Sequence, residues 1–381
     1  MATVEETIEE QRLQRAIRQL IRKLDKRLIP FLMLLEFSAF GSQMITGHTE
    51  LTTFKADLKL SSIHESLAVT LLYAAYSYGF TKIGSFSGLR DWQWIFILEG
   101  LPIIVLGIII YIFLGNIPET VQWLNNSEKE LLTNILREDG GKANDAPVSE
   151  HWISWRQVKY ALTDWRIYLY ILIGIGIVTP MLCFTLVLPS LLDGVNASVS
   201  VTHLMVAPMY VIASITCLLG SYSSSRYNEH GLHTAFWLFV SFIGFIVLVI
   251  VGDQSKTAIY ISSCIVCCGI YTAYPIALSW LTKNIGGHTK RAMAICCFVA
   301  MCQIGGIIKI IIYREDDKPT YRRGHSICAG VIAVALLSTF ILHRSLMKEN
   351  QRRQILSLDE YNREETIEEP CDKHPGFRYV L

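Results

Sequence analysis

Glu36 is the ionisable residue whose position is hardest to explain by packing alone. It lies about eight residues into an apolar run that begins near residue 28, which is roughly 12 Å along a helix. A charge at that depth in hydrocarbon is expensive, so such a carboxylate is by default a candidate for proton coupling or for a substrate cavity. A neutral Glu36 packed between helices is the alternative, and the sequence leaves both open.

Four further polar side chains stand inside apolar runs of the later half of the chain. They are Tyr271, Tyr274, Ser279 and Gln303. Their hydroxyl and amide groups can line a cavity and hydrogen-bond a substrate. The same groups can instead join one membrane helix to the next, and the sequence does not choose between these roles.

The cysteine pattern does not indicate a metal site. Cys264, Cys267 and Cys268 form a C-x-x-C-C run, but no histidine or carboxylate accompanies it. Free cysteine usually behaves as a small buried apolar residue. The chain also lacks a nucleotide-binding loop, a nucleophile elbow and metal-ligand spacing, so we expect no cofactor, no metal and no enzymatic activity.

The composition is that of a membrane protein. The 381 residues are 51% hydrophobic and 18% charged, with a mean hydropathy of +0.36, whereas charged residues make up about 25% of an ordinary soluble protein. The formal net charge of +1 gives no support for nucleic-acid binding. We therefore expect an all-α, multi-pass membrane protein whose first partner is the lipid bilayer.

Nine stretches meet the requirement of about 20 apolar residues for a membrane-spanning helix. They are 28–47, 66–83, 94–115, 167–190, 204–222, 234–252, 258–281, 292–313 and 326–344. They divide the chain into five parts: an amphipathic segment at 1–27, a first bundle at 28–115, a linker at 116–166, a second bundle of six spans at 167–344 and a tail at 345–381. The amphipathic segment is expected to lie on the inner membrane surface. In the linker, Ser127 and Glu130 predict the capping box of a helix.

Basic residues orient the spans. A loop that follows Trp280 carries His288, Lys290 and Arg291, and basic loops stay on the cytoplasmic side while Trp sits at the headgroup level. The linker and both tails are also basic, which suits six spans in the second bundle. Three spans in the first bundle are an odd number and cannot join two cytoplasmic segments. Either the stretch 66–83 does not cross the membrane, or part of that bundle is missing.

Several motifs in the right order resemble one family. They are DWQWIFILEGLP at 91–102, IPET at 117–120, GHTKRA at 287–292 and YRRGH at 321–325. The chain resembles the fungal anion:cation symporters of the major facilitator superfamily, the allantoate permease family. The resemblance implies proton-coupled uptake of a small organic anion, such as nicotinate, allantoate or pantothenate, by alternating access across the plasma membrane.

The departures from that family concern the first half. The resemblance implies twelve spans, but only some 50 residues separate the first span from residue 91, too few for the spans between them. Ser42 and Gln43 stand where the family carries an Asp-Arg pair. We therefore expect a major facilitator fold with a complete six-helix C-terminal half and an incomplete N-terminal half.

The resemblance also assigns roles. Lys309 is a candidate partner for a substrate carboxylate, although snorkelling to the membrane interface is an alternative. Gln43 joins Glu36 as a candidate on the pathway, and His288, Lys290 and Arg291 become candidates for a loop that changes conformation. The rival hypothesis is a degenerate or incomplete member that does not transport and acts at most as a membrane interaction partner. The oligomeric state is not indicated.

Overall fold

The chain folds into helices in every part that the structure describes. The computed structural model describes residues 12–26, 28, 101, 104–109, 123–140, 154–193, 199–251, 255–318, 320–365 and 371–381. These fall into two compact units, Met1–Asp139 and Gly140–Leu381. Glu36, Gln43, the predicted spans 28–47 and 66–83 and most of 94–115 lie outside the described residues.

The first unit pairs the amphipathic segment with the start of the linker. Residues 12–26 are helical, and Leu20 is buried against Leu124. Lys23 donates to the Glu128 carboxylate at 2.7 Å. Part of the apolar face predicted to lie on the membrane thus packs against protein, while Leu13 stays half exposed.

The capping box of the linker helix lies two residues earlier than predicted. The helix α5 spans Asn126–Gly140, and the Asn125 carbonyl accepts the first helical hydrogen bond from Lys129. The Glu128 carboxylate accepts from the Asn125 amide at 2.9 Å. Asn serves as an N-cap as well as Ser does, and this earlier start places Glu128 where it can also bind Lys23.

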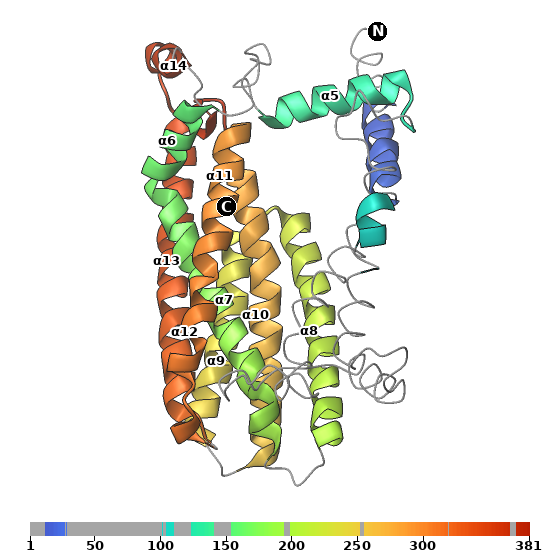
Figure 1. Ribbon diagram of the computed structural model, residues 1–381. Helices are drawn as coiled ribbons and strands as arrows, with labels where there is room; N and C mark the ends of the chain where they lie inside the picture. Colours follow the sequence, from blue (N-terminus) through green and yellow to red (C-terminus); the bar gives the residue numbers. More distant parts are fainter. Residues whose placement is uncertain are drawn as a thin grey trace. The chain divides into compact units, whose positions relative to one another are not determined.

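The second unit is a helical bundle, shown with its labels in Figure 1. Its helices are α6 (Trp155–Thr163), α7 (Trp165–Asp193), α8 (Val199–Tyr227), α9 (Gly231–Val251), α10 (Lys256–Asn284), α11 (His288–Cys302), α12 (Ile304–Ile312), α13 (Arg322–Gln354) and α14 (Leu358–Glu365). Short 3-10 turns form at Glu315–Asp317 and Cys371–Lys373. We call the end of the bundle where α7, α9 and α11 begin and α10 ends the linker end.

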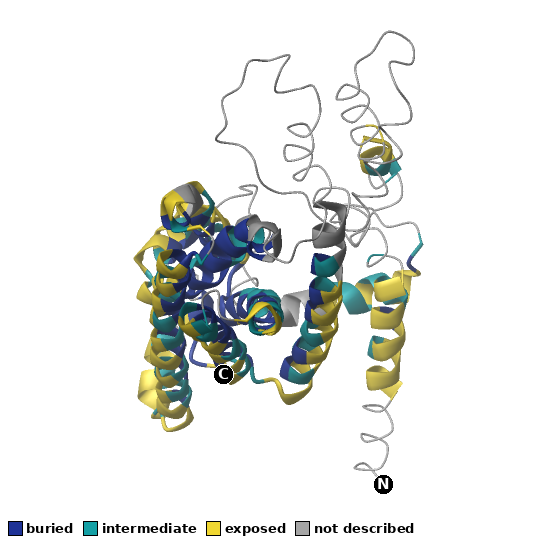
Figure 2. Ribbon diagram, turned by 90° about the horizontal axis from the view of Figure 1, so that it is seen from below, coloured by how far each residue is buried: buried dark blue, intermediate teal, exposed yellow. Residues whose placement is uncertain are grey.

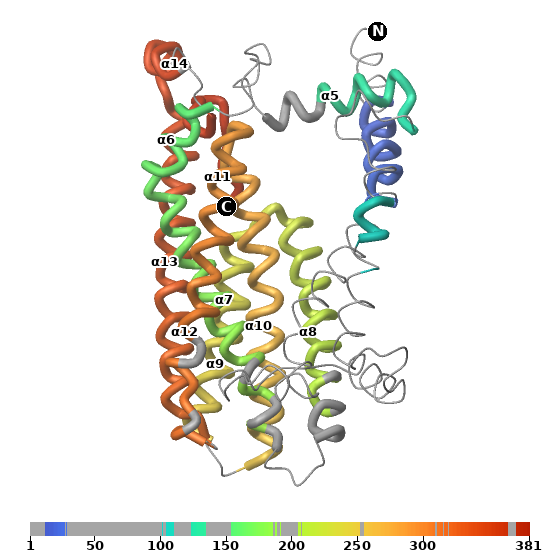
Figure 3. Tube along the Cα trace, in the orientation of Figure 1, coloured from blue at the N-terminus to red at the C-terminus, as the bar shows by residue number. Residues whose placement is uncertain are grey.

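Five of the described helices are long and apolar enough to cross a membrane. Four of these stretches are Trp165–Thr185, Gly231–Val251, Lys256–Asn284 and Arg322–Gln354, and the fifth, His288–Ile308, runs through α11 into α12. The helix α8 covers the remaining predicted span of the second bundle but is not among the five. Most helices extend beyond the apolar runs that predicted them. The helix α13, for example, extends along the whole bundle in Figure 3. An apolar run marks only the part of a helix that lies in the hydrocarbon core of the bilayer, whereas the helix itself continues for as long as its backbone hydrogen bonds are made.

The stretch predicted as one span at 292–313 is interrupted. The α11 helix ends at Cys302 and α12 starts at Ile304, with Gln303 between them. A Cβ atom at Gly305 would lie 2.0 Å from Thr179 Oγ1 of α7, so only glycine allows the two backbones to approach this closely.

The core of the bundle lies around α7 and α10, which bury most of their length. Figure 2 shows buried residues gathered on the inner sides of the helices and exposed residues on the outer sides. Trp280 is fully buried and contacts Tyr170 at 5.1 Å between ring centroids. Trp280, expected at the headgroup level, is thus buried among protein side chains. Residues 379–381 cover it, and its indole N–H donates to the Val380 carbonyl at 2.9 Å.

Candidate functional site

Three helices bring hydroxyl groups together inside the bundle. Tyr271 of α10 and Thr185 of α7 have their side-chain oxygens 2.9 Å apart. The ring of Tyr210 from α8 meets the Tyr271 ring edge to face, with centroids 5.5 Å apart. All three side chains are half-buried.

Two further polar contacts join α10 to α8. Thr272 donates to Thr216 of α8 at 3.3 Å, and Tyr260 donates to the Met205 carbonyl at 3.1 Å. Hydroxyl groups of this kind donate to an anion and accept from a cation or an amide. The group formed by Thr185, Tyr210 and Tyr271, which we call the hydroxyl site, places three hydroxyl groups beside two aromatic rings. Thr185 donates to the Met181 carbonyl at 2.7 Å, so its oxygen accepts from Tyr271.

The other residues predicted to line a pathway are distributed over α10, α11 and α12. Tyr274 and Ser279 lie on α10 and are half-buried, and the Ser279 carbonyl accepts from the Thr282 hydroxyl at 2.9 Å. Gln303 is exposed at the break between α11 and α12. Lys309 belongs to α12, and its side chain lies outside the described set.

Lys290 is not in a loop. It lies in the first turn of α11 and is fully buried. Its Nζ donates to Asp164 Oδ2 at 2.7 Å and also to Asp372 Oδ1. The loop prediction was wrong because the helix begins at His288, directly after Gly287, while the two carboxylates come from the linker and the tail. His288 itself is exposed.

Hydrogen bonds connect the start of α11 to α6. Gln157 Oε1 accepts from the backbone amides of Thr289 and Lys290 at 3.0 and 3.2 Å, which satisfies two of the amides that a helix start leaves unpaired. Gly287 has φ +82°, and a Cβ there would lie 3.0 Å from Gln157 Oε1. Arg291 closes the turn by donating from Nε to the Ile285 carbonyl at 2.9 Å.

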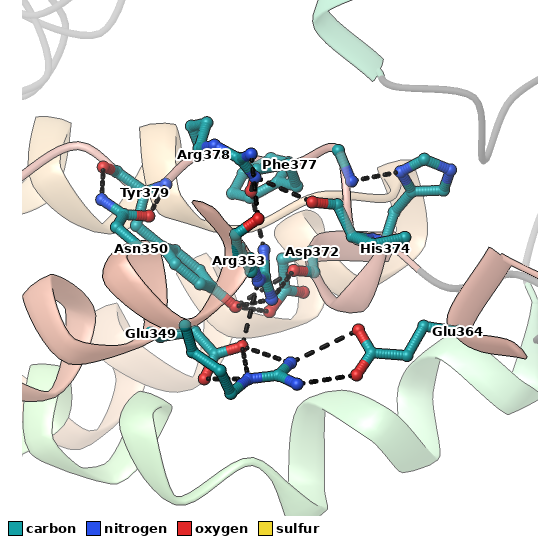
Figure 4. Close-up of polar contacts among 12 residues, drawn as sticks. Glu349, Asn350, Arg353, Glu364, Asp372, His374, Phe377, Arg378 and Tyr379 are labelled. Carbon is teal, nitrogen blue, oxygen red and sulfur yellow. Dashed lines mark hydrogen bonds and ion pairs between the residues drawn. The ribbon is translucent and has the colours of Figure 1, made fainter. Parts of the chain in front are cut away.

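Tyr379 sits between two guanidinium groups. The centroid of its ring is 4.8 Å from Arg166 and 4.7 Å from Arg353. Its hydroxyl accepts from Arg166 Nη1 at 2.6 Å and donates to the Asp372 carbonyl at 3.0 Å. Burial raises the pKa of Tyr379 above its ordinary value, so the phenol stays protonated. Figure 4 shows Tyr379, Arg353, Asp372 and Glu349 converging at this point.

These contacts define a buried ionic cluster at the linker end of the bundle. Its members are Asp164, Arg166, Lys290, Glu349, Arg353, Asp372 and Tyr379. Only Lys290 had been singled out from the sequence. The others were grouped with the linker and the tail, since residues more than 80 positions apart give no sequence signal of pairing. The apolar and aromatic end of the tail, from Phe377 to Leu381, was the one available sign that the tail packs.

The chain is similar in sequence to known membrane transporters. Residues 32–308 match the family described as Major Facilitator Superfamily. The chain is 31% identical over 260 residues to the MFS transporter prlL of a fungal species, a match that covers 68% of this chain and 52% of that protein. It is 27% identical over 308 residues to an uncharacterized transporter of Schizosaccharomyces pombe, covering 80% of this chain and 60% of that protein.

A third relative has a named substrate. The high-affinity nicotinic acid transporter of Saccharomyces cerevisiae is 26% identical over 313 residues, which cover 80% of this chain and 56% of that protein. The chain thus matches only about half to three-fifths of the length of these relatives. All three are transport proteins and not enzymes.

Proposed function

Because the chain belongs to the Major Facilitator Superfamily, we propose that it is a secondary transporter that carries a small organic anion together with protons across the plasma membrane. It is a multi-pass membrane protein with transporter relatives. In this proposal the chain is of the allantoate permease type, its first bundle is incomplete, and the substrate crosses by alternating access.

The hydroxyl site is the observation that supports this function best. Hydrogen bonds from hydroxyl groups to a carboxylate are short and strong because the acceptor is charged. The edge-to-face pair of Tyr210 and Tyr271 leaves aromatic surface that suits a flat ring. A planar aromatic carboxylate of the nicotinate class fits both features, and one relative is named for that substrate.

Other predicted residues extend the proposal. Tyr274, Ser279 and Gln303 are further candidates along the pathway, and Lys309 and Glu36 remain candidates for pairing the carboxylate and for carrying the proton. Midplane sites in such transporters lie where helices of the two repeats face one another. We assign Lys290, with its neighbours His288 and Arg291, a conformational role at the linker end.

The test is uptake of radiolabelled nicotinate by yeast that lacks its own permeases and expresses this chain, at pH 5 and pH 7. We expect faster uptake at pH 5. Tyr271→Phe removes one donor and should raise KM about tenfold, since a hydrogen bond to a charged group contributes about 1.5–3 kcal/mol.

Tyr222→Phe is the matched control, because Tyr222 lies on α8 and is 70% exposed; its uptake should equal that of the wild type. If the protein reaches the cell surface and takes up no carboxylate at either pH, the non-transporting alternative replaces this proposal. If uptake occurs and Tyr271→Phe leaves KM unchanged, the substrate site lies elsewhere.

A further inference from the structure

Residues 371–381 are bound to the bundle through their main chain. The Val380 amide donates to Asn284 Oδ1 at 2.7 Å, and the Val380 carbonyl accepts from Asn284 Nδ2 at 2.8 Å. Asn350 does the same for Tyr379, with distances of 2.9 and 2.7 Å. Each asparagine therefore pairs both main-chain groups of one residue, as a neighbouring strand does when a protein binds an extended peptide.

The last residues also complete a helix start. The Leu381 carbonyl accepts from the backbone amides of His230 and Gly231, which precede and begin α9. Such amides have no partner within their own helix. The Val380 carbonyl accepts in addition from the indole N–H of Trp280. The segment therefore provides hydrogen-bond acceptors for donors at the start of α9 and on α10.

Two side chains of the segment enter specific positions. Asp372 accepts from the buried Lys290, and Tyr379 lies between Arg166 and Arg353. Figure 4 shows the segment from Asp372 to Tyr379 folded over Arg353, whose Nη1 donates to the Phe377 carbonyl at 2.8 Å. Main-chain pairing with pockets for a few side chains is how peptide-binding domains combine affinity with specificity.

Glycine makes room for this segment. A Cβ atom at Gly286 would lie 2.7 Å from the Asp372 amide nitrogen, and one at Gly287 would lie 2.5 Å from Cys371 Sγ. Real Cβ atoms do not approach so closely, so the loop between α10 and α11 is shaped to accept the segment.

The contacts suit release as well as binding. Many of them are hydrogen bonds and ion pairs. Phe377, Val380 and Leu381 are half-buried, whereas Cys371, Asp372 and Tyr379 are buried. A hydrogen bond of this kind is exchanged for one to water on release, so each contributes only modestly to binding. We propose that the linker end of the bundle is a peptide-binding site, that residues 371–381 are its ligand, and that this segment is a releasable latch on the start of α11.

Release has a defined consequence. Lys290 has two carboxylate partners, Asp164 and Asp372, and only Asp372 leaves with the latch. The start of α11 then keeps its contacts with Asp164, with Gln157 and with the Ser154 amide, which donates to Thr289 Oγ1 at 3.3 Å.

Cys371 reports the state of the latch, because it is 4% exposed when the segment is bound. The full chain in lipid nanodiscs is treated with a maleimide, and the modification rates of Cys371 and Cys328 are followed by mass spectrometry. Cys328 is fully buried in α13 and reports global unfolding. An excess of synthetic peptide 371–381, with Cys371→Ser, should compete for the site and accelerate Cys371 modification at least severalfold.

The control peptide carries Tyr379→Ala as well and should have little effect. In the chain itself, Tyr379→Phe removes the hydroxyl bonds to Arg166 and Asp372, and it should raise the Cys371 rate about tenfold, whereas Tyr222→Phe should not change it. A Cys371 rate that neither peptide nor variant alters would overturn the proposal. So would a rise that Cys328 shares, because the segment would then leave only when the bundle unfolds.

Discussion

Lys290→Met is the substitution whose effect follows most directly from the ionic cluster. The side chains of Lys290, Asp372 and Asp164 are 1%, 3% and 12% exposed. Methionine is similar in length and fills the same space, but it leaves two carboxylates that have lost their shared cation. Removing one partner of a buried ion pair costs about 3–5 kcal/mol, mainly because the remaining charge stays buried.

The partner substitution should cost less. Asp372→Asn leaves Lys290 paired with Asp164 and retains a polar group of the same shape, so we expect a loss of about 1–3 kcal/mol. In the double variant the charge of Asp372 no longer needs a cation. Its loss should therefore be smaller than the sum of the single losses by about 0.5–3 kcal/mol, as for other residues in direct contact.

Thermal unfolding in nanodiscs measures these differences. One kcal/mol shifts Tm by about 2–4 °C for a unit of 150–250 residues, so Lys290→Met should lower Tm by roughly 6–20 °C. Lys373→Met is the matched control, since Lys373 is exposed and lies over the Tyr160 ring at 5.0 Å, a contact that contributes about 0.5–1 kcal/mol. A Tm for Lys290→Met equal to that of the control, or strictly additive losses in the double variant, would refute the reasoning.

Three further outcomes are expected from local geometry. Gly305→Ala should lower the free energy of unfolding by about 1–3 kcal/mol, because the new methyl group would overpack against Thr179. Gly330 has open space around it, so Gly330→Ala should be neutral or stabilising in the same thermal unfolding assay. Ser154→Ala should cost about 0.5–2 kcal/mol, because its hydroxyl caps α6, and restoring the cap with Asp should recover most of the loss. Burial lowers the pKa of His230 to about 4, below its ordinary 6.5, so the unfolded chain binds a proton that the folded chain does not between those values. Stability should therefore fall as pH drops from about 6.5 toward 4, by at most about 1.4 kcal/mol per pH unit. His230→Gln should make Tm less dependent on pH in this range. If Tm depends on pH equally in that variant, the dependence belongs to another group.

The second bundle was predictable where hydropathy carries the information. The apolar runs that predict spans at 234–252 and 258–281 coincide with α9 and α10. The break at Gln303 was not predicted, although Gly305 and Gly306 follow it, because a glycine pair is also typical of close helix packing. Gly305 packs closely against Thr179, a residue more than a hundred positions away.

The ionic cluster was predictable only in part, for a different reason. Lys290 drew attention as a basic residue near a loop, and basic loops predict orientation well. What the residue binds depends on where the linker and the tail return to the bundle, which no local pattern encodes. Asp164 and Asp372 look like ordinary charges of polar segments, and only the fold turns them into the two partners of one buried cation.

The hydroxyl site and the latch share two helices, and this arrangement constrains how they can influence each other. Thr185 and Arg166 lie on α7, about 28 Å apart along the helix at 1.5 Å per residue, and α10 carries Tyr271 and then Asn284 at its end. If release of the latch changes the affinity of the hydroxyl site, linkage requires that substrate changes the release of the latch by the same factor. Saturating nicotinate would then alter the modification rate of Cys371, and a chain whose latch is fully released would bind nicotinate with an affinity altered by the same factor. An effect in one direction without the other would mean that the two sites respond to different events, even though the same helices carry both.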